Sequence, residues 1–154
     1  MRFLFAAVLV LCCGLSLAET GTLKSLTAKQ AAELVAKHKE YYLYLNGLTS
    51  IDKDVAKELA KFKGDFCLSL VGLTSIDKDV AKELAKLKKG DLWLLSLTSI
   101  DKDVAQELAK VKSLSLYGLT SIDKDVAQEL AKFKGNRLAL GLTSIDKDVA
   151  QELA

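Results

Sequence analysis

The sequence predicts an α/β solenoid whose short parallel strands line a concave face and whose short helices cover the convex face. The string Leu-Thr-Ser-Ile-Asp-Lys-Asp-Val-Ala occurs five times, starting at Leu48, Leu73, Leu97, Leu119 and Leu142. Successive starts are 25, 24, 22 and 23 residues apart, which leaves room for one strand and one helix in each copy. Because a single copy cannot bury its own apolar faces, we expect the copies to stack on one another.

Each copy contains a strand pattern followed by a helix pattern. In the second copy, Leu68-Ser69-Leu70 alternates with period two and Gly72 ends the run, which predicts a strand and a turn. The segment 76–85 places apolar residues on one helical face. Asp77 is suited to cap the start of this helix, while Lys86, Lys88 and Gly90 are typical of its end.

The first 18 residues predict a secretory signal peptide. Arg2 precedes an apolar run from 3 to 11, and the small residues of Ser16-Leu17-Ala18 follow, so we expect cleavage after Ala18. The run is shorter than the roughly 20 residues of a transmembrane helix. A lipoprotein signal at Cys12 or Cys13 is disfavoured because no small residue precedes them. The protein is therefore expected to be secreted or periplasmic.

Three parts of the chain follow from these patterns: the signal peptide at 1–18, an N-terminal capping helix within 19–40, and the five-copy array at 41–154. The last copy stops inside its helix at Leu153-Ala154, before the usual ending of the other copies. Terminal repeats normally need a polar cap. This predicts either a truncated gene product or end-to-end self-association through the uncapped final coil.

Charge and cysteine content narrow the classes of partner. The chain has 22 basic and 20 acidic residues, a formal net charge of +2, with both signs interspersed. This balance argues against a nucleic-acid partner, and no segment after the signal peptide is apolar enough for a membrane span. Cys67 is the only cysteine after Ala18, so the mature chain has no intrachain disulfide. Cys67 takes an outward strand position that could pair with another chain, although an unpaired thiol is expected.

The copies resemble leucine-rich repeats. They are most similar to a bacterial secreted variety whose units read Leu-x-Leu-x-Gly-Leu-Thr-Ser-Leu, then an acidic helix, then Leu-Ala-x-x-Lys-Gly. The resemblance extends from Leu26 to Ala154. It implies the solenoid architecture and does not imply a particular activity.

The residues that differ between copies predict a binding face. They concentrate at outward strand positions, whereas the exposed helix positions are nearly identical between copies. Tyr and Trp, which are enriched at binding hot spots, occur among the variable residues. We therefore expect a protein or peptide to bind across Tyr42, Tyr44, Asn46, Ser69, Trp93, Leu95, Ser115 and Tyr117. Aromatic residues also simply suit strands, so a passive structural or spacer protein of the cell envelope is the alternative.

The sequence contains no expected catalytic, cofactor-binding or metal-binding residues, and we expect no enzyme activity. The aspartate pair that recurs in every copy is explained by helix capping, and the intervening lysines oppose calcium binding. His38 is the only histidine and takes a helix-end slot filled by apolar residues in other copies, so a half-buried position is expected. A hydrolase is therefore disfavoured.

Overall fold

The computed structural model describes residues 23–38 and 41–153 of the chain. Within these residues the fold is α/β, with one five-stranded parallel sheet whose order β1-β2-β3-β4-β5 follows the sequence. The strands are β1 Tyr42–Tyr44, β2 Cys67–Ser69, β3 Asp91–Trp93, β4 Ser113–Leu116 and β5 Arg137–Leu140. The helices are α2 Ala28–Lys37, α3 Lys53–Leu59, α4 Lys78–Leu84, α5 Lys102–Leu108, α6 Lys124–Leu130 and α7 Lys147–Leu153.

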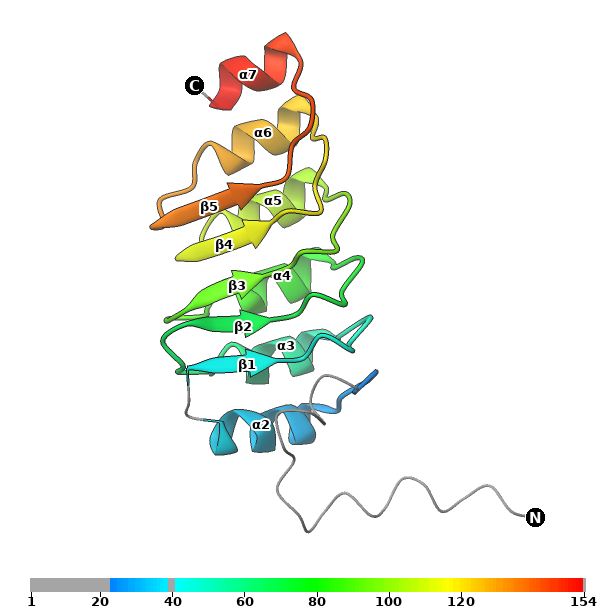
Figure 1. Ribbon diagram of the computed structural model, residues 1–154, viewed down its shortest axis with the longest axis vertical. Helices are drawn as coiled ribbons and strands as arrows, with labels where there is room; N and C mark the ends of the chain where they lie inside the picture. Colours follow the sequence, from blue (N-terminus) through cyan, green and yellow to red (C-terminus); the bar gives the residue numbers. More distant parts are fainter. Residues whose placement is uncertain (1–22, 39–40, 154) are drawn as a thin grey trace, which may run out of the picture.

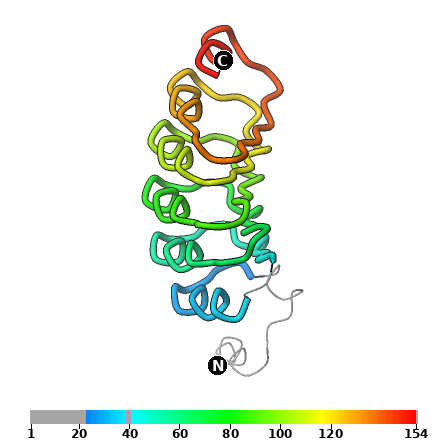
Figure 2. Tube along the Cα trace, turned by 90° about the vertical axis from the view of Figure 1, so that its left-hand side faces the viewer, coloured from blue at the N-terminus to red at the C-terminus, as the bar shows by residue number. Residues whose placement is uncertain are grey.

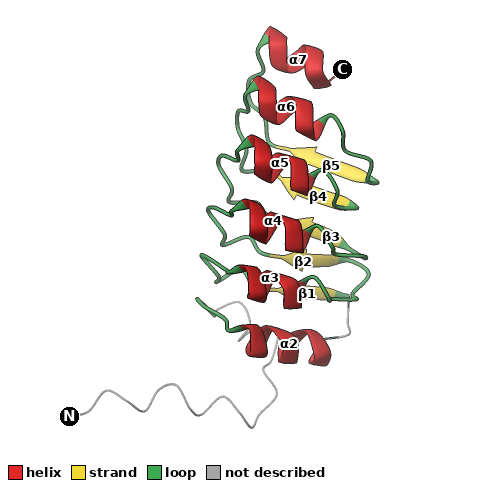
Figure 3. Ribbon diagram, turned by 180° about the vertical axis from the view of Figure 1, so that it is seen from behind, coloured by secondary structure: helices red, strands yellow, loops and turns green. Residues whose placement is uncertain are grey.

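Strands and helices alternate along the chain and form two layers. All strands lie on one side of the stack and all helices on the other, and each helix contacts the next one along the chain (Figures 1 and 2). The helices spread further apart along the stack than the strands do (Figure 3). The predicted solenoid-like arrangement of parallel strands and short helices is confirmed at this level.

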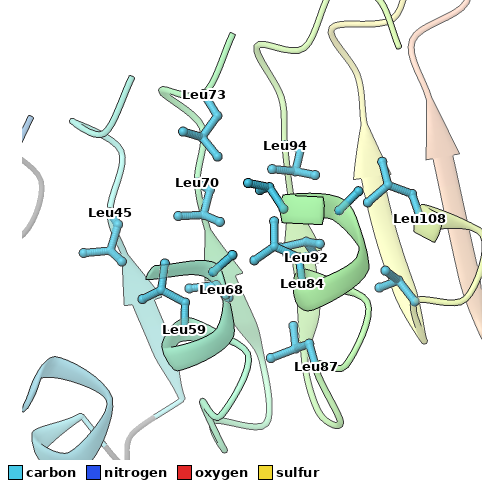
Figure 4. Packing of buried hydrophobic residues seen from close by; sticks show 14 of the residues in the cluster. Leu45, Leu59, Leu68, Leu70, Leu73, Leu84, Leu87, Leu92, Leu94 and Leu108 are labelled. Atoms are coloured by element: carbon cyan, nitrogen blue, oxygen red, sulfur yellow. The ribbon is translucent and has the colours of Figure 1, made fainter. Parts of the chain in front are cut away.

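The core between the layers is built mainly from leucine. Leucines in the strands or directly after them point toward the helices and stack in two rows, which are fully covered from β1 to β4 (Figure 4). The first row is Leu43, Leu68, Leu92 and Leu114, and the second is Leu45, Leu70, Leu94 and Leu116. Val80, Ala81 and Leu84 of α4 meet these rows from the helix side, as do their counterparts in the other helices. The side chains of consecutive copies thus complete a core that a single copy lacks.

Each helix of the repeated copies begins at an aspartate cap. The Asp77 carboxylate accepts a hydrogen bond of 2.8 Å from the Val80 backbone N–H, and the same bond recurs at Asp52, Asp101, Asp123 and Asp146. The predicted capping role of Asp77 is confirmed. Ile76 lies before the cap, in the loop, and packs against the core.

Two glycines allow the coils to approach closely. A Cβ on Gly72 would collide with the backbone carbonyl oxygens of Asn46 and Leu48 in the preceding coil. Gly90 has φ of +75°, a left-handed conformation that residues with a side chain rarely adopt. Its predicted place at the end of the helix is wrong, because α4 ends at Leu84 with Ala85 as its C-cap, and Gly90 directly precedes β3.

The ends of the stack differ from its middle. α2 packs against α3 and begins with a capping box formed by Thr27 and Gln30. His38 follows α2 and is half-buried, as expected. In the last coil Leu138 and Leu140 are only partly buried and Ile145 is 54% exposed. The predicted signal peptide and its cleavage after Ala18 lie outside the described residues.

None of the helices in the described part of the chain combines the length and the apolar run needed to cross a bilayer.

Glutamates lie between neighbouring helices and are held by lysines one turn further on. The Lys86 ammonium donates a hydrogen bond of 2.6 Å to the Glu83 carboxylate, whose residue is only 5% exposed. Equivalent bonds join Lys110 to Glu107 at 2.7 Å and Lys132 to Glu129 at 2.8 Å. The hydrogen bond from Lys86 keeps the pKa of Glu83 below its ordinary value, despite the opposing effect of burial.

We predict that Asp77→Ala lowers the free energy of unfolding by about 0.5–2 kcal/mol, since the first turn of α4 loses its hydrogen-bond acceptor. Urea unfolding followed by circular dichroism measures this change. Ser75→Ala is the matched control, because Ser75 is exposed and lies two residues away from the cap. Equal stability of the two variants would contradict the capping role.

We predict that Glu83 contributes to unfolding at acidic pH. A carboxyl whose pKa is lower in the folded state stabilises the fold above its unfolded pKa of roughly 4.3. That stabilisation is lost as the pH falls through the lower folded value. Urea unfolding at pH 6 and pH 3 should therefore show a smaller acid-induced loss in Glu83→Gln than in the wild type. The same loss in both proteins would show that this carboxylate does not carry the effect.

Candidate functional site

The parallel register places the variable strand residues on the side of the sheet that faces away from the helices. Side chains alternate along a strand, so the residues between the buried leucines form two outward rows. One row runs Tyr42, Cys67, Asp91, Ser113 and Arg137, and the other runs Tyr44, Ser69, Trp93, Ser115 and Ala139. We call this side of the sheet the strand face.

Large and small side chains alternate along both rows from β1 to β4. Adjacent strands lie only about 4.8 Å apart, so the large residues cover the small ones between them. Cys67 and Ser69 are each 1% exposed, and Ser115 is 3% exposed, although all three have outward register positions. Of the residues predicted to contact a partner, Ser69 and Ser115 thus form the floor of the strand face, and larger neighbours form its accessible surface.

Four aromatic residues gather at the β1 end of the strand face. The rings of Tyr42 and Tyr44 are stacked with centroids 5.6 Å apart, and Tyr42 also stacks on Phe66 at 5.1 Å. Tyr41 meets Phe66 edge to face at 5.2 Å. Tyr41 and Phe66 are 61% and 52% exposed, which leaves a continuous aromatic surface open to solvent. We call Tyr41, Tyr42, Tyr44 and Phe66 the aromatic cluster.

Sequence reasoning missed Tyr41 and Phe66. Both residues directly precede a strand, and they occupy the same place in neighbouring coils. The backbone N–H of Phe66 donates a hydrogen bond of 3.0 Å to the Tyr41 carbonyl, which holds the two residues side by side. Their shared position one residue before the alternating run was the available signal.

The remaining predicted residues lie further along the strand face. Trp93 and Leu95 are half-buried, whereas Tyr117 is 52% exposed. Asn46 is exposed, and its side-chain oxygen accepts a hydrogen bond of 2.6 Å from the Ser69 hydroxyl. Five of the predicted residues share the strand face by register, whereas Asn46, Leu95 and Tyr117 follow the ends of their strands. The aromatic contacts found among the described residues are confined to the cluster.

An ion pair that was not predicted from the sequence crosses the strand face. Arg137 of β5 lies 3.5 Å from the Asp91 carboxylate of β3, and Ser113 of β4 stands between them in register. A small serine lets the arginine side chain pass over β4. This pair gives the strand face one charged, hydrogen-bonding position beside its aromatic surface.

The Cys67 thiol is shielded from solvent. Burial, with a smaller effect of the nearby Asp91 carboxylate, raises the pKa of Cys67 to about 11. The outward register position was predicted correctly, but the suggested pairing with another chain is disfavoured because neighbouring side chains cover the sulfur. Burial also raises the pKa of Tyr44, with the neighbouring Cys67 and Tyr42 adding to the shift.

The described residues contain no group of three or more His, Cys, Asp or Glu side chains arranged to hold a metal ion. The repeated aspartates at the helix starts are engaged as caps.

We predict that Cys67 resists alkylation in the folded protein. A thiol pKa raised from 9.0 to about 11 reduces the reactive thiolate by about two orders of magnitude near neutral pH. Iodoacetamide labelling, followed by mass spectrometry of the peptide that carries Cys67, gives the rate with and without guanidinium. Equal rates in the two conditions would contradict the burial of this sulfur.

A scan against protein-family models, a search of curated proteins and a search of solved structures gave no match to this chain. The candidate site therefore has to be judged on its own geometry.

Proposed function

We propose that the chain is a leucine-rich-repeat-like binding module that holds a protein or peptide segment against a concave strand face. The observation that carries this proposal is the exposed aromatic cluster. Large aromatic side chains left open to solvent on a rigid sheet are typical of binding surfaces, since they supply contact area with few rotatable bonds.

Curvature of the stack supports the concave geometry. Strands in a sheet lie about 4.7–4.9 Å apart, whereas packed helices lie about 8–10 Å apart. Each coil is therefore a wedge that is thinner on the strand side, in agreement with the wider spread of the helices (Figure 1). Stacked wedges curve around the strand face, so a partner there would contact several coils at once.

The polar groups on the strand face suit a peptide partner. The exposed Asn46 amide can donate and accept hydrogen bonds, which matches the needs of a peptide backbone. The Asp91 and Arg137 pair offers both charges within one contact region. The aromatic cluster would anchor the apolar side chains of a peptide, and these polar groups would orient its backbone and charged side chains.

The strand face is also organised before binding. Parallel backbone hydrogen bonds hold the strands in register, and stacking limits the rotation of Tyr42 and Tyr44. A surface that loses little freedom on binding retains more of its contact energy as affinity. Because the sequence predicts a signal peptide for export, we expect the partner to lie outside the cytoplasm.

The experiment selects peptides from a phage-displayed library on the full chain and measures their binding by tryptophan fluorescence. Trp93 is the only tryptophan, so a change in its emission reports on contact at the strand face itself. A hydrophobic contact should shift the emission to shorter wavelength as solvent is displaced. Selected peptides without any effect on Trp93 would bind elsewhere and would count against the proposal.

We predict that Tyr44→Ser with Tyr117→Ser weakens the selected peptides at least tenfold, about 1.4 kcal/mol, because both rings lie on the strand face. Lys57→Ser with Lys82→Ser is the control on the exposed helix face, and should leave binding within about twofold. Circular dichroism and thermal unfolding establish that both variants fold. If the library yields no binding peptides, or both variants bind like the wild type, the passive spacer replaces this proposal.

A further inference from the structure

Lysines gather where the helices end and the chain turns toward the next strand. The first lysine after each helix is Lys61, Lys86, Lys110 or Lys132, and each is bound to a glutamate three residues earlier at 2.6–2.8 Å. A second lysine follows two residues later, at Lys63, Lys88, Lys112 and Lys134. We call these four second lysines the lysine edge.

The lysine edge carries charge that the described residues do not neutralise. All four of its members are exposed, and none lies within 4.0 Å of a carboxylate in the described part of the chain. The first lysine of each pair already serves the helix end and the glutamate one turn earlier. The second lysine is therefore left with its charge facing solvent.

The opposite edge, where the helices begin, is arranged differently. Lysines at the helix starts reach to an aspartate of the next coil, with Lys53 to Asp79 at 3.3 Å and Lys78 to Asp103 at 3.2 Å. Lys102 continues the series with Asp125 at 3.7 Å. Charges at this edge are thus paired between coils from Lys53 to Lys102, whereas the four lysines of the lysine edge have no carboxylate partner among the described residues.

Two depressions lie along the lysine edge. The larger, about 560 Å³, lies between the ends of α3 and α4, and its lining includes Ala60, Lys63 and Lys88. Glu83 also lines it, with its carboxylate paired to Lys86. The second, about 520 Å³, lies at the ends of α5 and α6, where Lys112 and Lys134 line it. Lysine side chains present methylene groups below a charged end, so both depressions combine apolar walls with cationic rims.

We propose that the lysine edge binds a linear acidic polysaccharide that runs along the stack. The edge supplies one unpaired ammonium per coil, and coils follow one another at a distance set by helices roughly 8–10 Å apart. This distance is comparable to the length of two linked sugar residues. A polymer with one carboxylate on every second sugar can therefore place a charge at each coil, with its ring faces against the apolar walls.

The same features favour this polymer over other polyanions. A nucleic-acid strand has one phosphate for each rise of about 3.4 Å, which is closer than the roughly 8–10 Å expected between packed helices. Binding of single strands also relies on exposed aromatic rings, but Phe62 beside the larger depression is 1% exposed. A lipid surface is flat, whereas two lysines of the lysine edge line each of the two depressions.

The experiment measures the anisotropy of a fluorescein-labelled hyaluronan oligosaccharide, which has one carboxylate per two sugars, as the full chain is added. The test variant changes Lys63, Lys88, Lys112 and Lys134 to Gln. The control changes Lys53, Lys78, Lys102 and Lys124 to Gln. Each removes four positive charges, from a formal +2 to 2 − 4 = −2, so net charge cannot distinguish them.

We expect the dissociation constant for hyaluronan to rise at least tenfold in the test variant and less than threefold in the control. Binding should weaken as salt is raised, because exposed charges are screened. Equal losses in both variants, or no binding by the wild type, would overturn the proposal. It is likewise overturned if an oligonucleotide of equal total charge binds more tightly, or if only phosphatidylserine vesicles bind.

Thermal unfolding of both variants shows whether they fold. If the fourfold test variant does not fold, Lys63→Gln with Lys88→Gln at the larger depression is measured against Lys53→Gln with Lys78→Gln. Hyaluronan binding by the lysine edge does not depend on peptide binding by the strand face, because the two proposals involve different residues and are tested with different variants.

Discussion

The parallel pairing of each strand with the next coil is the constraint on which the rest of the structure depends. A three- or four-residue strand on a seven-residue helix cannot bury its own leucines, so each copy is stable only when its neighbours cover it. In-register pairing brings Leu43, Leu68 and Leu92 into one continuous row. The aspartate caps start each helix at the same place in its copy, and Gly72 lets its turn approach the preceding coil closely. Both features keep the coils at the spacing that the leucine row requires.

The same pairing determines which strand residues a partner can reach. Because the strands are so closely spaced, two large outward side chains on adjacent strands would occupy the same volume. A small side chain that lies between large ones on the two flanking strands is covered by them. Ser69 lies between Tyr44 and Trp93 in this way, and Ser113 lies beneath the path from Arg137 to Asp91. Variation between copies on this face thus produces both accessible anchors and a buried floor.

The fold could be predicted from the sequence because its signals are local and repeated. The five identical strings reveal the period, and the spacing around Asp77 identifies both the cap and the helix that follows. The strand-face contacts could not be predicted in the same way. Copies of 25, 24, 22 and 23 residues do not reveal which side chains meet across coils, so the stacking of Phe66 on Tyr42 became apparent only with the register.

The copies are nearly identical on their helices and variable on their strands. The two surfaces of the molecule therefore differ in how strongly their residues are repeated. The residues at the helix start recur in every coil and form charge pairs between coils, as between Lys53 and Asp79, so a substitution there removes one pair of a ladder. A substitution on the strand face changes one coil only and leaves the leucine rows intact. The strand face can therefore vary without loss of the fold. The proposed affinity of the lysine edge for an acidic polymer depends instead on repetition, since four weakly attractive charges act on one polymer together.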